Sequence, residues 1–252
     1  MSTFLVLLRK ELLEQWRTMR LPSFLVVFFF VGVLSPATAR YLPRLLEALG
    51  GAAFAAAFPA PTIQDAYAQL AKNVGQLGTL VVIVISMAAV SSERERGTLA
   101  FLFSKPVARG SFLAAKLAGL GATLLLGTLL AGAVAYLYTA LLFAPPTWGF
   151  VLLCLASFLT LLVFAAITLA ASAITGSAVA AGGTGIVALL VFGMLSILPA
   201  VGPYAPTGAL ARATEIMSGA SPETLLGPLV AQVGIVAVAF AVSLAAFSRQ
   251  EF

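Results

Sequence analysis

Long uncharged segments constrain this chain more than any other feature. Runs of about 20 residues without a charged side chain recur along its length, and an apolar helix of about that length spans the hydrocarbon core of a bilayer. Only 9% of the 252 residues are charged, which is too few for a water-soluble domain of this size. A β-barrel would instead show short segments of alternating polarity. The sequence therefore predicts an all-α polytopic membrane protein.

Six transmembrane helices are expected within a single transmembrane domain. We predict spans over residues 21–39, 74–90, 117–142, 148–174, 178–198 and 225–247. Residues 40–73 and 199–224 contain several glycines and prolines, and we expect both to be external segments. Residues 48–64 fit either a fully external segment or one that touches the membrane. Residues 209–217 predict a short helix that lies at the outer edge of the membrane or dips into it.

Residues 1–20 predict an amphipathic helix at the membrane interface. Its apolar side chains recur every three or four positions, at Leu5, Leu8, Leu12, Trp16 and Met19. Tryptophan and arginine are suited to the headgroup level, so Trp16, Arg17 and Arg20 are predicted to be interfacial anchors. A soluble docking helix would show the same pattern. Pro22 is expected to mark the turn into the first span.

The distribution of lysine and arginine predicts the orientation. An even number of spans places both termini on one side, and that side carries ten of the 14 basic residues, namely Arg9, Lys10, Arg17, Arg20, Arg94, Arg96, Lys105, Arg109, Lys116 and Arg249. The other side carries Arg40, Arg44, Lys72 and Arg212. Because cytoplasmic loops are enriched in basic residues, we expect a multi-pass protein of the cell (inner) membrane with both termini in the cytoplasm.

The segment between the second and third spans, residues 93–116, is dense in charges of both signs. Four consecutive charged residues, Glu93 to Arg96, would cost on the order of 10 kcal/mol within hydrocarbon, so this loop lies outside the membrane. The run from Leu99 to Phe103 is nevertheless strongly apolar. We predict a short cytoplasmic helix that begins near Thr98 and docks on another protein. Alternatively, the charges cap the second span at the headgroups and the apolar run lies in the interface.

The chain lacks the residues that most membrane enzymes require. It has no histidine, and its one cysteine, Cys154, lies in an apolar run. Gly110 to Lys116 approaches a phosphate-binding loop, but Ala115 and Leu117 replace the second glycine and the hydroxyl residue. The predicted spans contain no lysine and no other ionisable residue. We therefore predict no catalytic, cofactor-binding or metal-binding residue, and any energy for transport must come from a partner.

Small residues recur every four positions along the third span, at Gly119, Thr123, Gly127 and Ala131. Ladders of this kind let two helix backbones approach closely. Gly182, Gly183 and Gly185 form a similar group near the start of the fifth span. Packing within the chain is expected for both groups, in preference to a seam between two copies.

The charged loop resembles the cytoplasmic loop of ABC-2 type permeases, the membrane subunits of one class of ATP-binding-cassette transporter. The matching pattern is Glu93-x-Glu95-Arg96-Gly97-Thr98-Leu99, then Leu102-x-Ser104-x-Pro106-Val107-x-Arg109. The wider plan is also similar to that family, with an amphipathic N-terminal helix, six spans and an external element before the last span. The resemblance covers nearly the whole chain.

This resemblance implies a permease subunit, in keeping with the family an exporter, that forms a translocation pathway with a second copy or a related permease. Cytoplasmic ATPase subunits, encoded separately, would bind ATP and Mg²⁺ and drive transport. The implied partners are those subunits, the second permease and membrane lipid, and no nucleic acid. The residues implied to couple to the ATPase are Glu93, Glu95, Arg96, Gly97, Thr98, Leu99, Phe101, Leu102, Phe103, Ser104, Pro106 and Arg109.

Within that segment, Leu99, Phe101, Leu102 and Phe103 would form the apolar docking surface, and the charges from Glu93 to Arg96 would set the register at its rim. The second and fifth spans would line the pathway. Thr79, Ser86 and Ser196 are the polar groups expected on this lining, which favours a hydrophobic or amphiphilic cargo. A competing interpretation is a non-transporting membrane scaffold or assembly factor whose loop recruits a cytoplasmic partner.

Overall fold

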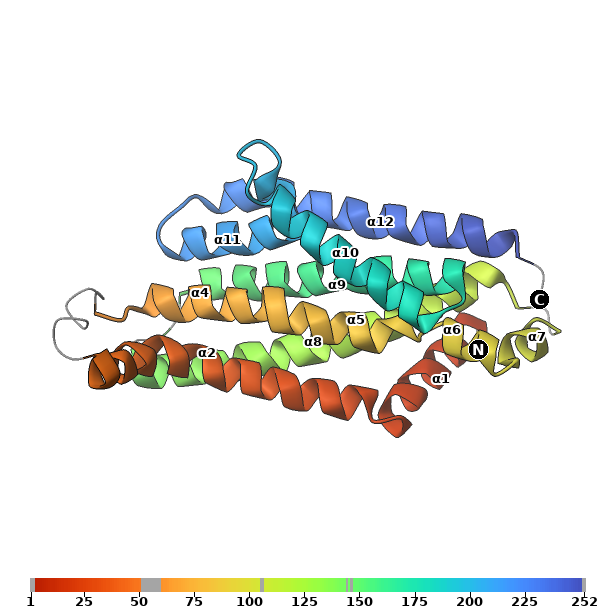
Figure 1. Cartoon of the computed structure of the whole chain (residues 1–252), viewed down its shortest axis with the longest axis horizontal. Coiled ribbons are helices and arrows are strands. Elements are labelled where there is room, and N and C mark those ends of the chain that lie inside the picture. The colour runs from red at the N-terminus through yellow and green to blue at the C-terminus, as the bar shows by residue number, and fades with distance from the viewer. Residues whose placement is uncertain (1–2, 51–59, 105–106, 144, 146, 251–252) are drawn as a thin grey trace.

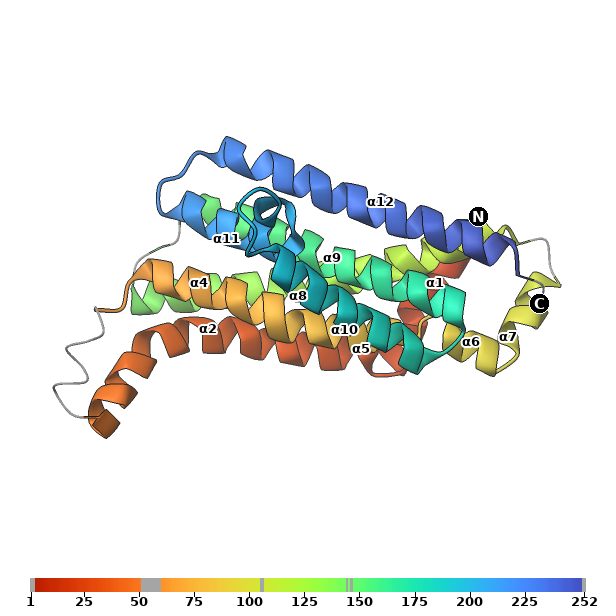
Figure 2. The same cartoon turned by 45° about the horizontal axis from the view of Figure 1, so that its top comes forward.

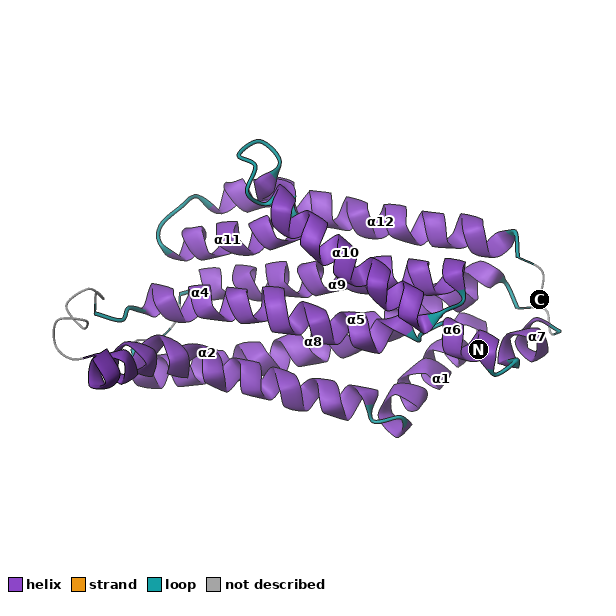
Figure 3. Ribbon diagram, in the orientation of Figure 1, coloured by secondary structure: helices purple, strands orange, loops and turns teal. Residues whose placement is uncertain are grey.

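The computed structural model describes residues 3–50, 60–104, 107–143, 145 and 147–250, and its longer helices run side by side in an elongated bundle (Figure 1). All regular structure in the described residues is helical (Figure 3). Six helices are long and apolar enough to cross a membrane: Arg20–Leu45, Ile63–Glu95, Arg109–Leu142, Gly149–Thr175, Ala178–Leu195 and Pro222–Ser248. The predicted all-α polytopic fold with six spans is confirmed.

The elements up to Phe103 are α1 (Thr3–Arg17), α2 (Arg20–Gly50), α4 (Ile63–Asn73), the π-helix η1 (Val74–Gly78), α5 (Thr79–Met87), α6 (Ser91–Glu95) and α7 (Thr98–Phe103). The remaining elements are α8 (Arg109–Leu142), α9 (Gly149–Thr175), α10 (Ala178–Leu195), the 3₁₀ turn η2 (Gly202–Tyr204), α11 (Pro206–Met217), the 3₁₀ turn η3 (Pro222–Leu225) and α12 (Leu226–Ser248).

Several helices extend beyond the apolar spans predicted from the sequence. The helix of the second span begins at Ile63, inside the segment expected to be external, because Asp65 accepts a hydrogen bond from the Thr62 backbone nitrogen (2.7 Å) and caps the first turn. The residues predicted as the second and third spans, 74–90 and 117–142, contain no charged side chain, but the helices that carry them extend further. Lys72, Glu93 and Lys116 all lie on helices of candidate spans, since a helix can continue past the hydrocarbon.

The chain breaks between α1 and α2 at Met19, which has a φ of 61°, a left-handed conformation that ends a helix. Pro22, expected to mark this turn, lies instead in the first turn of α2, where a proline costs no helical hydrogen bond. Before the break, α1 runs at an angle to the bundle (Figure 1). Its polar side is the buried one, through Glu11 and Gln15, whereas Trp16 is 59% exposed.

The small-residue ladder of α8 packs against α1 and α2 of the same chain, as expected. A Cβ on Gly119 would lie 3.1 Å from Glu11 Cβ, and a Cβ on Gly127 would lie 2.2 Å from the Phe24 ring. The Thr123 hydroxyl donates a hydrogen bond to the Gln15 side chain. The prediction of intrachain packing is confirmed for this ladder.

Helix α9 occupies the centre of the bundle and contacts α5, α8, α10, α11 and α12. Its side chains Leu153, Leu161 and Ala165 are fully buried and join a core that includes Phe24 and Phe28 of α2. A helix that is apolar on all sides and covered by neighbours is typical of a bundle centre. The other helices are therefore arranged around a fixed central element.

The fifth candidate span, α10, is followed by a break in the helical chain. Helix α10 ends at Leu195, and after a loop and η2 the chain continues as α11, which lies beside α4 and α9 and extends towards the end of the bundle away from α7 (Figure 2). A Cβ on Gly208 would lie 1.8 Å from the Gly202 carbonyl oxygen, so only glycine permits this close backbone contact. The short helix predicted at residues 209–217 is present as α11.

Candidate functional site

The loop between the second and third candidate spans, α1, and both ends of the described chain gather at one end of the bundle (Figure 1). At this end α6 and α7 are joined by Gly97, which has a φ of 69° and adopts the left-handed conformation that glycine favours. The Thr98 hydroxyl donates to the Glu93 carbonyl oxygen (2.9 Å). The turn from α6 into α7 is therefore fixed by local hydrogen bonding.

The apolar side chains of α7 do not all face the same way. Leu99 is 1% exposed and packs inside the bundle, whereas Phe101 is 71% exposed. The Phe103 ring lies 5.7 Å from the Phe112 ring and 5.8 Å from the Phe247 ring, and Leu102 is half-buried. The apolar run therefore both attaches α7 to its own chain and presents Phe101 outward.

The remaining residues of the predicted coupling segment also divide into two groups. Glu95, Arg96, Gly97, Thr98 and Ser104 are exposed on the surface. Arg109 instead donates to the carbonyl oxygens at the end of α12, at 2.9 Å to that of Phe247, a favourable position for a cation at a helix C-terminus. Pro106 lies outside the described residues.

A buried ion-pair cluster ties α6 to α1 and α8, and we refer to Lys10, Glu11, Glu14, Glu93 and Lys116 as the ion-pair cluster. Lys116, with its side chain only 3% exposed, donates to Glu11 Oε2 at 3.0 Å and to Glu93 Oε1 at 2.9 Å. Lys10 bonds Glu93 and lies 3.1 Å from Glu11 and 3.3 Å from Glu14. Glu93 is thus inside the chain, and not at the exposed rim predicted for it.

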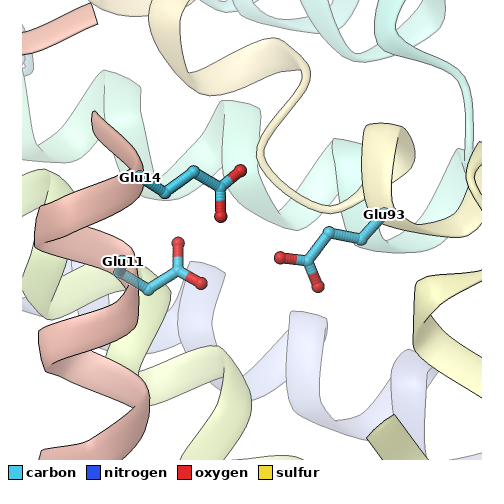
Figure 4. A group of neighbouring side chains, drawn as sticks. All are labelled: Glu11, Glu14 and Glu93. Atoms are coloured by element: carbon cyan, nitrogen blue, oxygen red, sulfur yellow. The ribbon is translucent and has the colours of Figure 1, made fainter. Parts of the chain in front are cut away.

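One carboxylate oxygen from each of the three glutamates of the ion-pair cluster lies within 4.8 Å of the other two. Glu11 and Glu14 on α1 face Glu93 on α6 (Figure 4). A metal ion could be held by such a group only if its oxygens were available. Here Lys10 and Lys116 already donate to them. The two ammonium groups therefore supply the compensating charge.

Charge compensation also acts on Lys10, which lies on α1 outside the membrane-spanning helices. Desolvation alone would lower the pKa of Lys10, but the hydrogen bond to Glu93 and the negative charges of Glu11 and Glu93 raise it above its ordinary value. Lys10 is thus held in its charged form at neutral pH.

Sequence reasoning missed the ion-pair cluster because its bonded partners are up to 105 positions apart in the chain. One signal was available in α1. Leu7, Glu11 and Gln15 recur every four positions and form the face that is buried, to one side of the apolar stripe that was recognised in the sequence. A glutamate and a glutamine one turn apart on the same face as a buried leucine indicate that this face contacts polar or positively charged side chains.

A second candidate site is a cavity of about 750 Å³ between α4, η1 and α5 on one side and α10 and α11 on the other, which we call the α4–α11 groove. Ser196, one of three polar residues predicted to line a pathway, lines this groove. Thr79 and Ser86 do not, because both are fully buried against other helices of the chain. The π-helix η1 contributes Gly75 and Gln76 to the lining, and π-turns inside helices frequently occur at functional sites.

Comparison with known proteins agrees with this architecture. The chain is similar to an uncharacterized transmembrane protein, YxlG, of Bacillus subtilis (strain 168), with 27% identity over 118 residues. The aligned part spans 46% of this chain and 46% of that relative. Residues 5–252 match the family described as ABC-2 family transporter protein, whose members are transmembrane components and not themselves catalytic. With nearly its whole length matched, the chain belongs to the ABC-2 family of transporter proteins and is a membrane permease.

Proposed function

We propose that this permease is the membrane-spanning subunit of an ATP-driven exporter, which works as a dimer and is moved by separate ATPase subunits that bind at α7. The observation that carries the proposal is the position of Phe101. This aromatic ring is 71% exposed on a short helix whose other apolar side chains, Leu99 and Phe103, are packed against the same chain. An aromatic side chain presented in this way is typical of the centre of a protein interface.

The surface around Phe101 is suited to a specific partner. Glu95 and Arg96 are exposed beside it at the end of α6, and charges of both signs at the rim of an interface fix register more than they add affinity. Thr98 is the first residue of α7 and Ser104 follows its last residue, so both lie close to Phe101 in the chain. The coupling surface proposed here is therefore narrower than the full segment from Glu93 to Arg109.

Movement of α7 would reach the membrane through two connections. Leu99 and Phe103 attach α7 to the cluster of side chains around Phe112 and Phe247, and Glu93 joins α6 to Lys116 of α8. We propose that ATP binding closes the paired ATPase subunits, shifts α7, and tilts α5 and α8 against the rest of the bundle. The change of access is then a two-state transition whose balance is set by nucleotide.

The surface of α10 supports pairing with a second permease, either another copy or a related chain. Only Ala181, Gly182 and Gly185 of this helix are buried, while Val187, Leu190 and Met194 are exposed. We propose that α10 and the α4–α11 groove face the translocation pathway between the two permeases, which agrees with the pathway expected between the second and fifth spans.

The charge distribution supports a cytoplasmic location for the end that carries α7, through the rule that basic residues favour that side. The exposed apolar stripe of α1 supports its placement in the inner-leaflet interface, because Leu5 and Trp16 face away from the bundle and Arg17 is exposed beside them. We propose Trp16, Arg17 and Arg20 as the interfacial anchors.

The decisive test is recovery of the ATPase subunit with the tagged full-length permease from native membranes. Phe101→Ala combined with Leu102→Ala is expected to reduce recovery of the ATPase at least tenfold, because it removes the exposed apolar surface of α7. Trp148→Ala is the matched control, since Trp148 is a 65% exposed aromatic residue just before α9, at the opposite end of the bundle.

Undiminished recovery of the ATPase with the double variant would overturn the assignment of α7 as the docking helix. Recovery of a cytoplasmic partner without ATPase activity would instead support the membrane scaffold. Helical content of both variants, measured by circular dichroism, must match that of the parent protein.

A further inference from the structure

We propose that the α4–α11 groove binds a single-chain amphiphile with an anionic headgroup, and that Lys72 recognises the headgroup. This inference rests on the proposed transport function, for which it names the chemical class of the cargo. It is carried by the order in which charged, polar and apolar side chains line the groove.

Lys72 is the one charged residue among the groove's lining residues that the structure describes. It lies near the C-terminus of α4, its side chain is exposed, and within the described part of the chain it has no ion-pair partner. Gln76 lines the same groove, and its side-chain amide can donate a hydrogen bond to an anion. Ser196 and Thr207 add polar surface, although their hydroxyls donate to the carbonyl oxygens of Gly193 and Phe192. A phosphate, sulfate or carboxylate headgroup is therefore favoured, and a cationic one is repelled.

The groove becomes apolar with increasing distance from Lys72. Leu77 and Leu80 follow on the same run of helix, and Leu189 of α10 faces them across the groove. Leu80 lies eight positions after Lys72, which corresponds to about 12 Å along a helix. An alkyl chain of an amphiphile whose headgroup lies at Lys72 would extend along these leucines.

The dimensions of the groove favour one alkyl chain. A volume of about 750 Å³ is in the range of ordinary small-molecule sites. In the proposed orientation α4, the helix that carries Lys72, lies in the half of the bundle nearer the outer leaflet, because it is away from α7 (Figure 1). The same chemistry would suit an outgoing cargo and a resident membrane lipid, and the experiment below separates these two sources.

The test uses the full-length permease in phosphatidylcholine nanodiscs and photo-crosslinking with dodecyl phosphate that carries a diazirine near the end of its chain. The expected result is saturable labelling of α5 and α10 around Leu80 and Leu189, which unlabelled dodecyl phosphate displaces. The same chain with a phosphocholine headgroup is expected to label less. Labelling that maps outside the groove, or equal labelling by the two headgroups, would overturn the proposal.

Variants of Lys72 test headgroup recognition. Lys72→Ala is expected to raise the half-saturating concentration of dodecyl phosphate about tenfold, a typical loss for a charge-assisted contact, without changing that of the phosphocholine probe. Lys72→Arg should remain close to the parent. Arg212→Gln is the matched control, because it removes a positive charge from α11 outside the groove, where Arg212 pairs with Glu215. An unchanged value for Lys72→Ala contradicts the assignment.

Variants of α10 test occupancy of the groove itself. Gly193 lines the groove, and a Cβ added there meets no atom within 4 Å, so Gly193→Leu fills the space without strain. This variant is expected to abolish labelling by both probes. Gly183→Leu is the control, because Gly183 on the same helix is equally unobstructed but is not part of the lining. Normal labelling of Gly193→Leu would show that the chain of the probe lies elsewhere.

A last arm adds the co-purified ATPase subunits with ATP. Loss of pre-bound dodecyl phosphate on ATP addition identifies a cargo, and retention identifies a resident lipid-like ligand. Binding itself is measured without the ATPase. If dodecyl phosphate binding depends on Lys72 but no ATPase is recovered with the permease, the anion site stands and the proposed function is refuted. If the ATPase is recovered but no such binding is found, the proposed function stands and the anion site is refuted.

Discussion

The two ends of the bundle are built differently. At the end with α7, Lys116 of the ion-pair cluster joins α8 to α1 and α6 by contacts of 3.0 and 2.9 Å, and its side chain is only 3% exposed. At the other end, the chain breaks between α10 and α11, η1 departs from α-helical geometry, and a groove opens among α4, α5, α10 and α11. The comparison shows that one end is held together by buried ion pairs, while the other leaves a groove between its helices.

The largest expected effect comes from breaking the ion-pair cluster at the α7 end. Lys116→Met is expected to lower the free energy of unfolding by about 3–5 kcal/mol, because it leaves the buried Glu11 and Glu93 with only one of their two lysine partners. Lys72→Met, which removes an exposed lysine at the other end, is expected to change it by less than about 0.5 kcal/mol. Unfolding in mixed micelles, followed by circular dichroism, measures both.

A compensated variant distinguishes charge from packing at Lys116. Adding Glu11→Gln and Glu93→Gln to Lys116→Met removes the two uncompensated carboxylates and is expected to restore much of the lost stability. Equal losses for Lys116→Met and Lys72→Met would show that the two ends do not differ in this respect.

A smaller loss of stability is expected at the close backbone contact between Gly202 and Gly208, next to the groove. Gly208→Ala should destabilise the protein by about 1–3 kcal/mol, because its Cβ would overlap the Gly202 carbonyl oxygen and force α11 away from the break. Gly193→Ala, a substitution into open space on the groove wall, should be close to neutral. Thermal midpoints of the two variants in the same detergent test this contrast, and a neutral Gly208→Ala would mean that the break is not rigid.

The smallest effect is expected at the exposed edge of the ion-pair cluster. Lys10→Ala should cost less than about 1 kcal/mol, since the Lys10 side chain is 44% exposed and Glu93 keeps its bond to Lys116. Because the pKa of Lys10 is raised in the folded state, Lys10 stabilises the fold in its charged form. That contribution is fully present below the ordinary lysine pKa and is lost only as pH rises through the raised folded-state value. The difference in stability between parent and variant should therefore be constant from pH 6 to 9, and a steep change in that interval would contradict it.

Much of the fold could be predicted from the sequence because membrane helices follow from local composition. The six apolar runs and the packing role of Gly119 and Gly127 depend on side chains close together in the sequence. The short helix at residues 98–103 was also predicted from a local pattern, an apolar run between charges and a proline.

The ion-pair cluster and the groove could not be predicted in the same way. Glu93 was expected at the surface because four consecutive charges are normally solvated, and only the packing of α1 across α8 brings Glu11 and Lys116 to it. Likewise Thr79 and Ser86 are buried because α5 lies against α9 and α10, a matter of tertiary contact that composition does not encode.

The second candidate span runs from Ile63 to Glu95 through α4, η1, α5 and α6, so one stretch of chain lines the groove near Lys72 and holds Glu93 at the opposite end. Thermodynamic linkage then works in both directions. If the proposed ATPase also prefers one position of this span, a molecule in the groove must alter, by an equal factor, how strongly the α7 end binds that ATPase. Cargo and nucleotide would then influence each other without direct contact.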